Sequence, residues 1–318
     1  MSRTATTVSA SELRGQILRL RGRLLAELRR AQGGLAEEPV HQSRVAARTL
    51  RSVLSTLKPL LEPTLSARAR RDLRNVALEL ETIRETDVRR DWLQELVART
   101  DALPPGARER LQRQLESDRR LARLEFRKHA GSEAYLERLE RLEAALGDPR
   151  LVAGSGDLRK LVSGRLTKRW KRLLRSRKAA RGADATALHE LRLAAKHARY
   201  ASESLMPMLG LDPRPAVKPV KRLQNCLGDH RDATQALAWL RGLGEPLSPL
   251  LVPRLKPAVR KVMAKREKEL ARLLERIEVP DLRAPPAGEG LRLRRASRRP
   301  GGRSPTSSGR RLRRSSAS

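Results

Sequence analysis

A twelve-residue segment occurs twice in this 318-residue chain, at positions 148 residues apart. Residues 40–51 and 188–199 agree at one histidine, two arginines and an adjacent pair of alanines, and Arg48 of the first copy is Lys196 in the second. The same or a nearly equal offset aligns Leu57 with Leu205, Pro59 with Pro207, Leu61 with Leu209, Leu80 with Leu227, Arg84 with Arg231, Glu85 with Asp232 and Trp92 with Trp239. So many agreements indicate an internal duplication. We therefore expect two similar halves, related by approximate two-fold symmetry and packed into one body.

The spacing of apolar residues predicts that both halves are helical. Leu, Ala and Val recur every three or four residues among Arg and Glu, whereas Phe, Trp and Tyr together make up 2% of the chain. This is the period of an amphipathic helix rather than of a strand. The sequence therefore predicts an all-α fold of two pseudo-symmetric four-helix bundles. Prolines and glycines place the helices at about 9–31, 40–61, 65–100, 106–146, 157–181, 186–209, 215–242 and 250–278, with the third and fourth open to a break.

The C-terminal segment differs from the rest of the chain. Residues 282–318 contain eleven Arg and one Glu among Pro, Gly and Ser, with few apolar residues. Such a segment cannot bury enough surface to fold, so we predict a disordered basic tail. The helical domain is then residues 1–281, with halves of about 9–147 and 155–279. It remains strongly basic without the tail.

The repeated segment carries a row of cations along one side of its helix. At about 100° per residue, four such side chains in each copy fall within roughly 80° of one another, opposite an apolar face. They are His41, Arg44, Arg48 and Arg51 in the first copy, and His189, Arg192, Lys196 and Arg199 in the second. Neither row contains an acidic residue to pair with a cation one turn away. A solvated charged surface is the ordinary interpretation of such a row, but its repetition favours a binding site.

The net charge limits the partner to polyanions. Lys and Arg number 70 against 36 Asp and Glu, a formal charge of +34 that attracts nucleic acid, anionic membrane or polyphosphate. The single cysteine, Cys226, excludes an intramolecular disulfide and a zinc ribbon. No apolar run approaches the roughly 18 residues that a membrane span needs, and the first residues do not resemble a secretory signal. We therefore expect a cytoplasmic protein that does not enter a membrane.

The repeated motifs resemble those of the CHAD domain, a helical family named for its histidines. Its opening motifs, of the form HxxRVAxRxLRS and LHxLRxAxKxxRY, are similar to residues 41–52 and 188–200. Its paired LGxxRDxDV and LGxxND-like elements are similar to residues 80–88 and 227–233, although Glu81 replaces Gly and Glu85 replaces Asp. The resemblance covers about 9–279. It implies a CHAD-like domain of two four-helix bundles around a basic groove or pore that binds inorganic polyphosphate, in some members at intracellular polyphosphate granules.

The resemblance also implies which residues contact the ligand. From the opening motifs these are His41, Arg44, Arg48, Arg51, His189, Arg192, Lys196, Arg199 and Tyr200. Arg119, Arg120, Arg123, Lys221 and Arg222 are similar to further basic positions of the family. Polyphosphate offers charge without bases, and a guanidinium can make two parallel hydrogen bonds to its oxygens. Binding through these residues weakens with salt, and modestly with rising pH as the histidines lose their protons.

Two other functions remain open at the level of the sequence. Non-specific DNA or RNA binding fits the charge and the tail, although only six aromatic residues are present to stack on bases. An enzyme acting on polyphosphate would gather carboxylates on a divalent metal, whereas the acidic residues here are dispersed along the helices. The five histidines lack metal-binding spacings, and basic neighbours repel a divalent cation. We therefore expect no metal, no cofactor and no catalysis.

Overall fold

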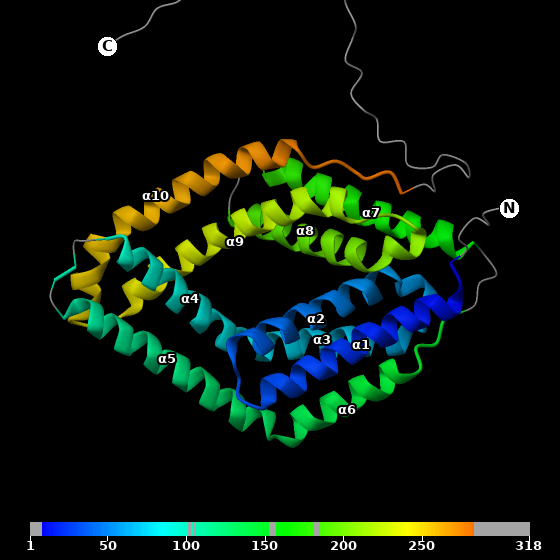
Figure 1. Cartoon of the computed structure of the whole chain (residues 1–318), viewed down its shortest axis with the longest axis horizontal. Coiled ribbons are helices and arrows are strands. Elements are labelled where there is room, and N and C mark those ends of the chain that lie inside the picture. Colours follow the sequence, from blue (N-terminus) through cyan, green and yellow to red (C-terminus); the bar gives the residue numbers. More distant parts are fainter. Residues whose placement is uncertain (1–7, 101–102, 105, 153–156, 181–184, 283–318) are drawn as a thin grey trace, which may run out of the picture. The chain divides into compact units, whose positions relative to one another are not determined.

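The computed structural model describes residues 8–100, 103–104, 106–152, 157–180 and 185–282. Within these ranges the chain is all-α, as predicted, and its only β contact is an isolated bridge between Leu61 and Leu151. The first half contains α1 (Ala10–Gln32), α2 (Glu37–Thr56), η1 (Lys58–Leu60), α3 (Pro63–Glu79), α4 (Glu81–Ala98), α5 (Ala107–Ala130) and α6 (Glu133–Gly147). The second half contains α7 (Leu158–Ala179), α8 (Ala185–Leu205), η3 (Pro207–Leu209), α9 (Arg214–Gly242) and α10 (Leu247–Glu275). Figure 1 shows their arrangement.

Each half consists of four helical rods, which confirms the predicted pair of four-helix bundles. In the second half α9 and α10 are continuous, whereas the matching rods of the first half are broken into α3 and α4 and into α5 and α6. The first break lies at Leu80, which caps both helices with φ −82° and ψ 0°, so no glycine is needed there. The second lies at Gly131 and Ser132. Both fall in the segments that the sequence left open to a break.

The helices that carry the repeated motif end earlier than predicted. The sequence placed their ends at residues 61 and 209, but α2 ends at Thr56 and α8 at Leu205. Pro59 and Pro207 explain the difference, because proline has no N–H to donate and its ring disfavours a continuing α-helix. The chain continues as the short 3-10 helices η1 and η3 at these prolines.

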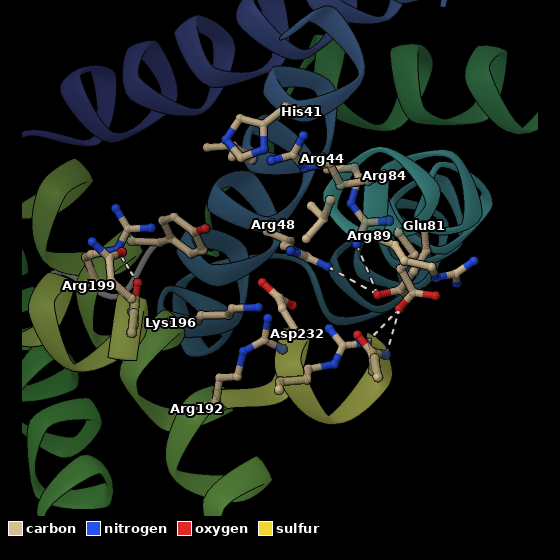
Figure 2. A pocket seen from close by; sticks show the side chains of 18 of the residues that line it. His41, Arg44, Arg48, Glu81, Arg84, Arg89, Arg192, Lys196, Arg199 and Asp232 are labelled. Carbon is tan, nitrogen blue, oxygen red and sulfur yellow. Dashed lines mark hydrogen bonds and ion pairs between the residues drawn. The ribbon is translucent and has the colours of Figure 1, made fainter. Parts of the chain in front are cut away.

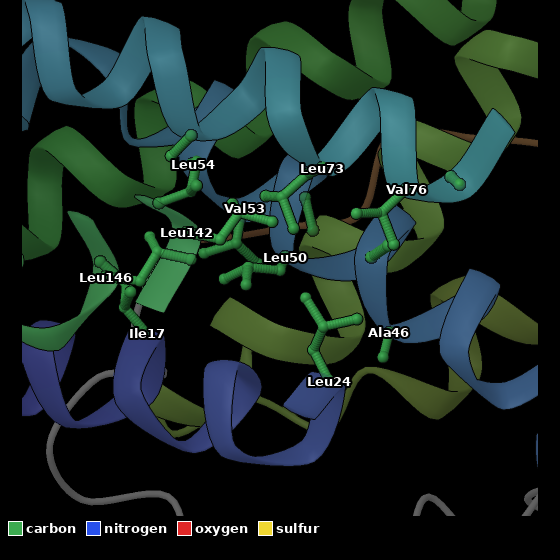
Figure 3. Close-up of a cluster of buried hydrophobic side chains, with 14 of the residues drawn as sticks. Ile17, Leu24, Ala46, Leu50, Val53, Leu54, Leu73, Val76, Leu142 and Leu146 are labelled. Atoms are coloured by element: carbon green, nitrogen blue, oxygen red, sulfur yellow. The ribbon is translucent and has the colours of Figure 1, made fainter. Parts of the chain in front are cut away.

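Three clusters of buried apolar side chains hold the helices together. The first lies among α1, α2, α3 and α6 and also takes in Leu166 of α7 and Leu205 of α8 (Figure 3). The second surrounds Trp170 among α7 to α10. The third joins α4 and α5 to α9 and α10, for example through Leu93 and Leu240. Because the first and third clusters draw on both halves, the halves form one body rather than two separable bundles.

The predicted tail begins one residue too early. Leu282, assigned to it, is only 6% exposed and belongs to the first cluster. The rest of the predicted tail lies outside the described residues. Among the described helices, none is both long and apolar enough to cross a membrane.

The two motif helices, α2 and α8, pack against each other. The Ser52 hydroxyl on α2 donates to the backbone carbonyl of His197 on α8 at 3.0 Å. The apolar faces predicted for both helices are buried, with Leu50 and Ala198 fully enclosed. Burial of each such leucine contributes about 1.5–3 kcal/mol, so the core holds both helices in a fixed orientation. Their cationic faces are thereby directed away from the apolar clusters.

Candidate polyanion-binding site

The cationic faces of α2 and α8 line two adjoining cavities, of about 250 Å³ and about 600 Å³. Seven residues line both of them, and we call these the central site. They are Arg48, Glu81, Glu85, Arg192, Lys196, Tyr200 and Arg231. Figure 2 shows Arg48, Arg192 and Lys196 approaching one another from the two halves of the chain. The duplication therefore brings its two cation rows to one place.

The two cavities concentrate positive charge. Their combined lining contains nine arginines and one lysine but only three carboxylates. The carboxylates are Glu81, Glu85 and Asp232. Cations held together behind low-dielectric walls attract anions more strongly than the same charges spread over an open surface. This lining can therefore accept a ligand that carries several negative charges.

Most of the predicted site residues lie in this lining. Arg48, Arg192, Lys196 and Tyr200 line both cavities. His41, Arg44 and Arg199 line the smaller cavity, and Arg51 and His189 line the larger one. The motif positions thus converge on one site, although the histidines differ: His41 is half-buried, whereas His189 is exposed.

The other five predicted residues are not brought to the cavities. Arg119 and Arg123 of α5 instead donate to Oδ1 of the fully buried Asp87, at 2.7 and 2.8 Å. Arg120, Lys221 and Arg222 are exposed and belong to neither lining. A basic residue on an amphipathic helix can bind a ligand, neutralise a buried carboxylate or remain in solvent, and the sequence alone does not distinguish these roles.

Sequence reasoning missed several lining residues. The cations among them are Arg74, Arg84, Arg89 and Arg231, and His197 of α8 joins the larger cavity. The repeat contains a signal for one pair, since Arg84 aligns with Arg231 across the two halves. For Arg74 and Arg89 no sequence pattern points to the site.

A carboxylate from α4 holds the cations of α2. Glu81 lies 3.0 Å from Nη2 of Arg44 and 3.7 Å from Nη2 of Arg48. Arg44 is 5% exposed, and burial together with the charge of Arg48 lowers its pKa to about 10. Burial would raise the pKa of Glu81, but the two arginines outweigh it and lower that pKa. Since Nη1 of Arg44 is buried without a partner, part of its donor capacity remains unused.

The ammonium group of Lys196 is buried among positively charged side chains. Burial and the charges of Arg48, Arg192, Arg231 and Arg44 lower the pKa of its ammonium to about 6. Burial and the neighbouring Arg231 and Arg48 also lower the pKa of Arg192, whose buried Nε has no hydrogen-bond partner. Bringing an anion to these groups would relieve their mutual repulsion.

Two arginines of the second half, Arg231 and Arg199, form side-chain hydrogen bonds within the site. Arg231 donates to Oε1 of Glu85 at 2.7 Å, and burial raises the pKa of the neighbouring Asp232. Arg199 donates to Gln224 at 2.7 Å and lies over the ring of Tyr200, with 4.3 Å from its Cζ to the ring centroid.

The acid-free row predicted on the second motif helix ends one turn past the motif. Arg199 forms an ion pair with Glu203 at 3.1 Å, at the (i, i+4) spacing that the predicted row lacks. The prediction is therefore wrong for the end of α8. The corresponding position on α2 is Ser55, so the ends of the two rows differ in charge.

A family model described as the CHAD domain matches residues 15–241, most of the chain and both repeated motifs. The chain belongs to the CHAD domain family. The resemblance stated from the motifs is thus confirmed, and no curated protein matches the chain by sequence.

Two solved structures share the CHAD fold of this chain. PptA from Streptomyces chartreusis is 20% identical, with a TM-score of 0.66, and the match covers 83% of this chain and 98% of that one. The CHAD domain from the plant Ricinus communis is 21% identical, with a TM-score of 0.64, and the match covers 89% of this chain and 97% of that one. At these identities the likeness shows the fold alone.

Proposed function

We propose that this CHAD-domain protein binds inorganic polyphosphate at the central site. The observation that carries the proposal is the convergence of nine arginines and one lysine on two adjoining cavities that hold only three carboxylates. Polyphosphate has charge along its whole length and no other feature to recognise, so it suits a lining made mainly of guanidinium groups. The family resemblance supports the same ligand.

The size and lining of the cavities favour polyphosphate over nucleic acid. Volumes of about 250 and 600 Å³ are those of small-molecule pockets. They admit an extended polymer of small units but not a duplex, whose major groove alone is about 12 Å wide. Single-stranded nucleic acid binds on exposed aromatic faces, whereas Tyr200, the aromatic residue of the site, is buried and covered by Arg199.

We propose binding without catalysis, in the cytoplasm and at polyphosphate granules. The carboxylates Glu81 and Glu85 accept from Arg44 and Arg231 rather than facing one another across a metal position. Within the described residues no group of three or more His, Cys, Asp or Glu side chains is placed to hold a metal ion. Release of orthophosphate from polyphosphate in the presence of Mg²⁺ or Mn²⁺, abolished by His41→Ala, would refute this part.

A competition experiment tests the ligand. Long-chain polyphosphate and duplex DNA compete for the full chain and for a version ending at Ala284, the limit of the compact unit. We expect the shortened version to prefer polyphosphate at physiological salt and to lose affinity as salt rises. A preference for DNA, or binding insensitive to salt, contradicts the proposal. DNA binding by the full chain alone would assign nucleic acid to the basic segment after Ala284.

Substitutions test the place of binding. Arg48→Gln with Arg192→Gln removes one central cation from each half, and neither residue is as enclosed as Arg44. We expect at least about a tenfold loss of affinity per removed charge-assisted hydrogen bond. The matched control is Arg108→Gln with Arg110→Gln, which removes the same charge from the exposed surface of α5. Equal losses in both variants would mean that net charge, rather than the central site, determines binding.

A further inference from the structure

The cation row of α2 continues beyond the motif through a residue of another helix. Ser55 follows Arg51 by four residues, about 6 Å along the helix axis. Arg169 of α7 donates to this position, from Nη2 to the Ser55 hydroxyl at 2.6 Å and from Nε to the Thr56 hydroxyl at 3.2 Å. The guanidinium of Arg169 therefore occupies the place where the next cation of the row would stand.

Arg169 belongs to a group of cations that we call the outer arginine cluster. It consists of Arg165, Arg169 and Arg172 of α7, with Arg70 of α3. Arg165 donates from Nε to the carbonyl of Thr56 at 3.3 Å, beside Arg169. Burial and the charges of the other three members lower the pKa of Arg169.

The outer arginine cluster has few compensating carboxylates. Among the residues that the structure describes, Arg172 has a distant partner in Glu190, 3.6 Å away, while Arg165 and Arg169 have only hydroxyl and carbonyl acceptors. Uncompensated guanidinium groups held close together by neutral acceptors form a ready site for phosphate oxygens.

The cluster adjoins the larger cavity through His197 and Arg51. Both line that cavity, and burial together with the charges of Arg169 and Arg51 lowers the pKa of His197 to about 4. The Nδ1 atom of His197 is buried without a hydrogen-bond partner. A line of cationic and donor groups thus runs from the central site past Arg51 and His197 to Arg169.

The duplication shows that the arginines at positions 165 and 169 are present on one side only. The buried residues Leu13, Ile17 and Leu24 of α1 match Val162, Leu166 and Leu173 of α7 at one constant offset. At the same offset Gln16 matches Arg165, and its side chain makes the equivalent contact, from Nε2 to the carbonyl of Ser204 at 3.0 Å.

The matched side lacks two of these charges, although Arg23 stands where α7 has Arg172. Leu20 stands where α7 has Arg169, and Glu203 stands where α2 has Ser55 and already pairs with Arg199. The contact between α7 and α2 therefore contains Arg165 and Arg169. The equivalent contact between α1 and α8 contains the neutral Gln16 and Leu20 together with the carboxylate of Glu203. Helix packing does not require arginines at this contact, because the neutral side chain of Gln16 joins α1 to α8 through the Ser204 carbonyl.

We propose that the outer arginine cluster is a second phosphate-binding site for the same polymer, which leaves the larger cavity past Arg51 and His197 and continues over Arg169. This inference rests on the proposed function and deepens it. A chain of a few phosphates is held by the central site alone, whereas a longer one also engages the cluster. The protein consequently favours long polyphosphate.

The experiment compares tripolyphosphate with polyphosphate of about one hundred units, binding to the full chain with Arg165, Arg169 and Arg172 changed to Gln. We expect the affinity for the long polymer to fall about tenfold or more, the effect of losing at least one charge-assisted hydrogen bond. Its salt dependence should flatten by roughly 0.7 for each lost phosphate contact, by analogy with single-stranded nucleic acid. The affinity for tripolyphosphate should stay within about twofold.

Two further variants keep the result interpretable. Arg165→Gln with Arg172→Gln retains Arg169, which joins α7 to α2, and should show a smaller loss for the long polymer alone. Changing the exposed Arg108, Arg110 and Arg113 of α5 to Gln removes the same charge elsewhere and should leave the length preference unchanged. Equal losses for both lengths, or none in the cluster variants, would overturn the inference. A wild-type chain that binds neither length would refute the proposed function itself, and this inference with it.

Discussion

Lys196 should take up a proton when a polyanion binds. With a pKa of about 6 for Lys196, its neutral form exceeds the charged form by about thirtyfold at pH 7.5. Bound phosphates would offset the four arginines around it and favour the ammonium form, raising the pKa toward the ordinary value of about 10.4. Between these two pKa values the complex holds about one proton more than the free protein. Affinity should then fall by up to about tenfold for each unit of rising pH.

Calorimetric titration in buffers of different ionisation enthalpy measures this proton uptake directly. At pH 8 we expect uptake of nearly one proton by the wild-type chain and close to none by Lys196→Met. Lys196→Arg, which stays charged at every accessible pH, should bind with little pH dependence. Burial and Arg84 also lower the pKa of His41, but His41 is present in both proteins, so the difference in proton uptake between them reports on Lys196. Equal proton uptake by wild type and Lys196→Met would refute the reasoning.

The same pKa shift has a consequence for the ligand-free fold. Because the folded pKa of Lys196 lies below the unfolded one, the unfolded chain binds more protons between about pH 6 and pH 10. The free energy of unfolding should therefore rise with pH in that window, by at most about 1.4 kcal/mol per unit from this group. Lys196→Met removes this slope and should melt at a higher temperature than wild type at pH 6.

Three substitutions test other contacts. Glu81→Gln releases Arg44 and Arg48, so polyphosphate affinity should rise about tenfold, or about 1.4 kcal/mol. The melting temperature without ligand should fall, because a buried arginine loses its partner. Weaker polyphosphate binding by this variant would contradict the prediction. Asp87→Ala leaves Arg119 and Arg123 without their buried carboxylate and should cost about 3–5 kcal/mol in urea unfolding, and a negligible cost would speak against their structural role. Leu50→Ala, at a fully enclosed core position, should cost about 2–5 kcal/mol in the same assay without changing affinity below the transition.

Helix type, the duplication and the two cation rows could be predicted from the sequence because each depends on local periodicity. Apolar residues at helical spacing define a buried face, and the opposite face of the same helix follows from geometry. Leu50 and Ala198 are buried as this argument requires, while Arg48 and Lys196 line the cavities between the halves. The convergence of the two rows followed from the repeat, since similar halves place matching faces at a common interface.

The broken rods and the shared third core could not be predicted in the same way. Leu80 ends α3 in ordinary right-handed backbone geometry, with neither proline nor glycine to mark it. Leu93 and Leu240 have the same helical spacing whether they pack within one half or across both. Their partners depend on how the rods cross, which is a property of the assembled tertiary structure.

The carboxylates that pair with the predicted arginines could not be predicted from the sequence either. Arg119 and Arg123 look like binding residues until Asp87, more than thirty positions earlier, is seen buried between them. Glu81 was noticed only as a departure from the family motif, yet it holds two predicted ligand residues. The expected pH dependence was assigned to histidines, whereas the structure places the large pKa shift on Lys196, because four arginines surround it only in the folded chain.

The carboxylates within the basic lining bear on which anions the site can hold. Glu81 and Glu85 already accept from Arg44 and Arg231, so an incoming phosphate would have to replace these contacts. A single orthophosphate replaces one such contact and gains little, since the charge it meets is partly neutralised. Successive phosphates on one polymer can replace several of these ion pairs. After the first phosphate has bound, each further contact is intramolecular, so it adds to the affinity without a further loss of translational entropy. If the site binds polyphosphate as proposed, Glu81 and Glu85 would therefore discriminate against small anions, and the outer arginine cluster would extend the advantage of a long chain.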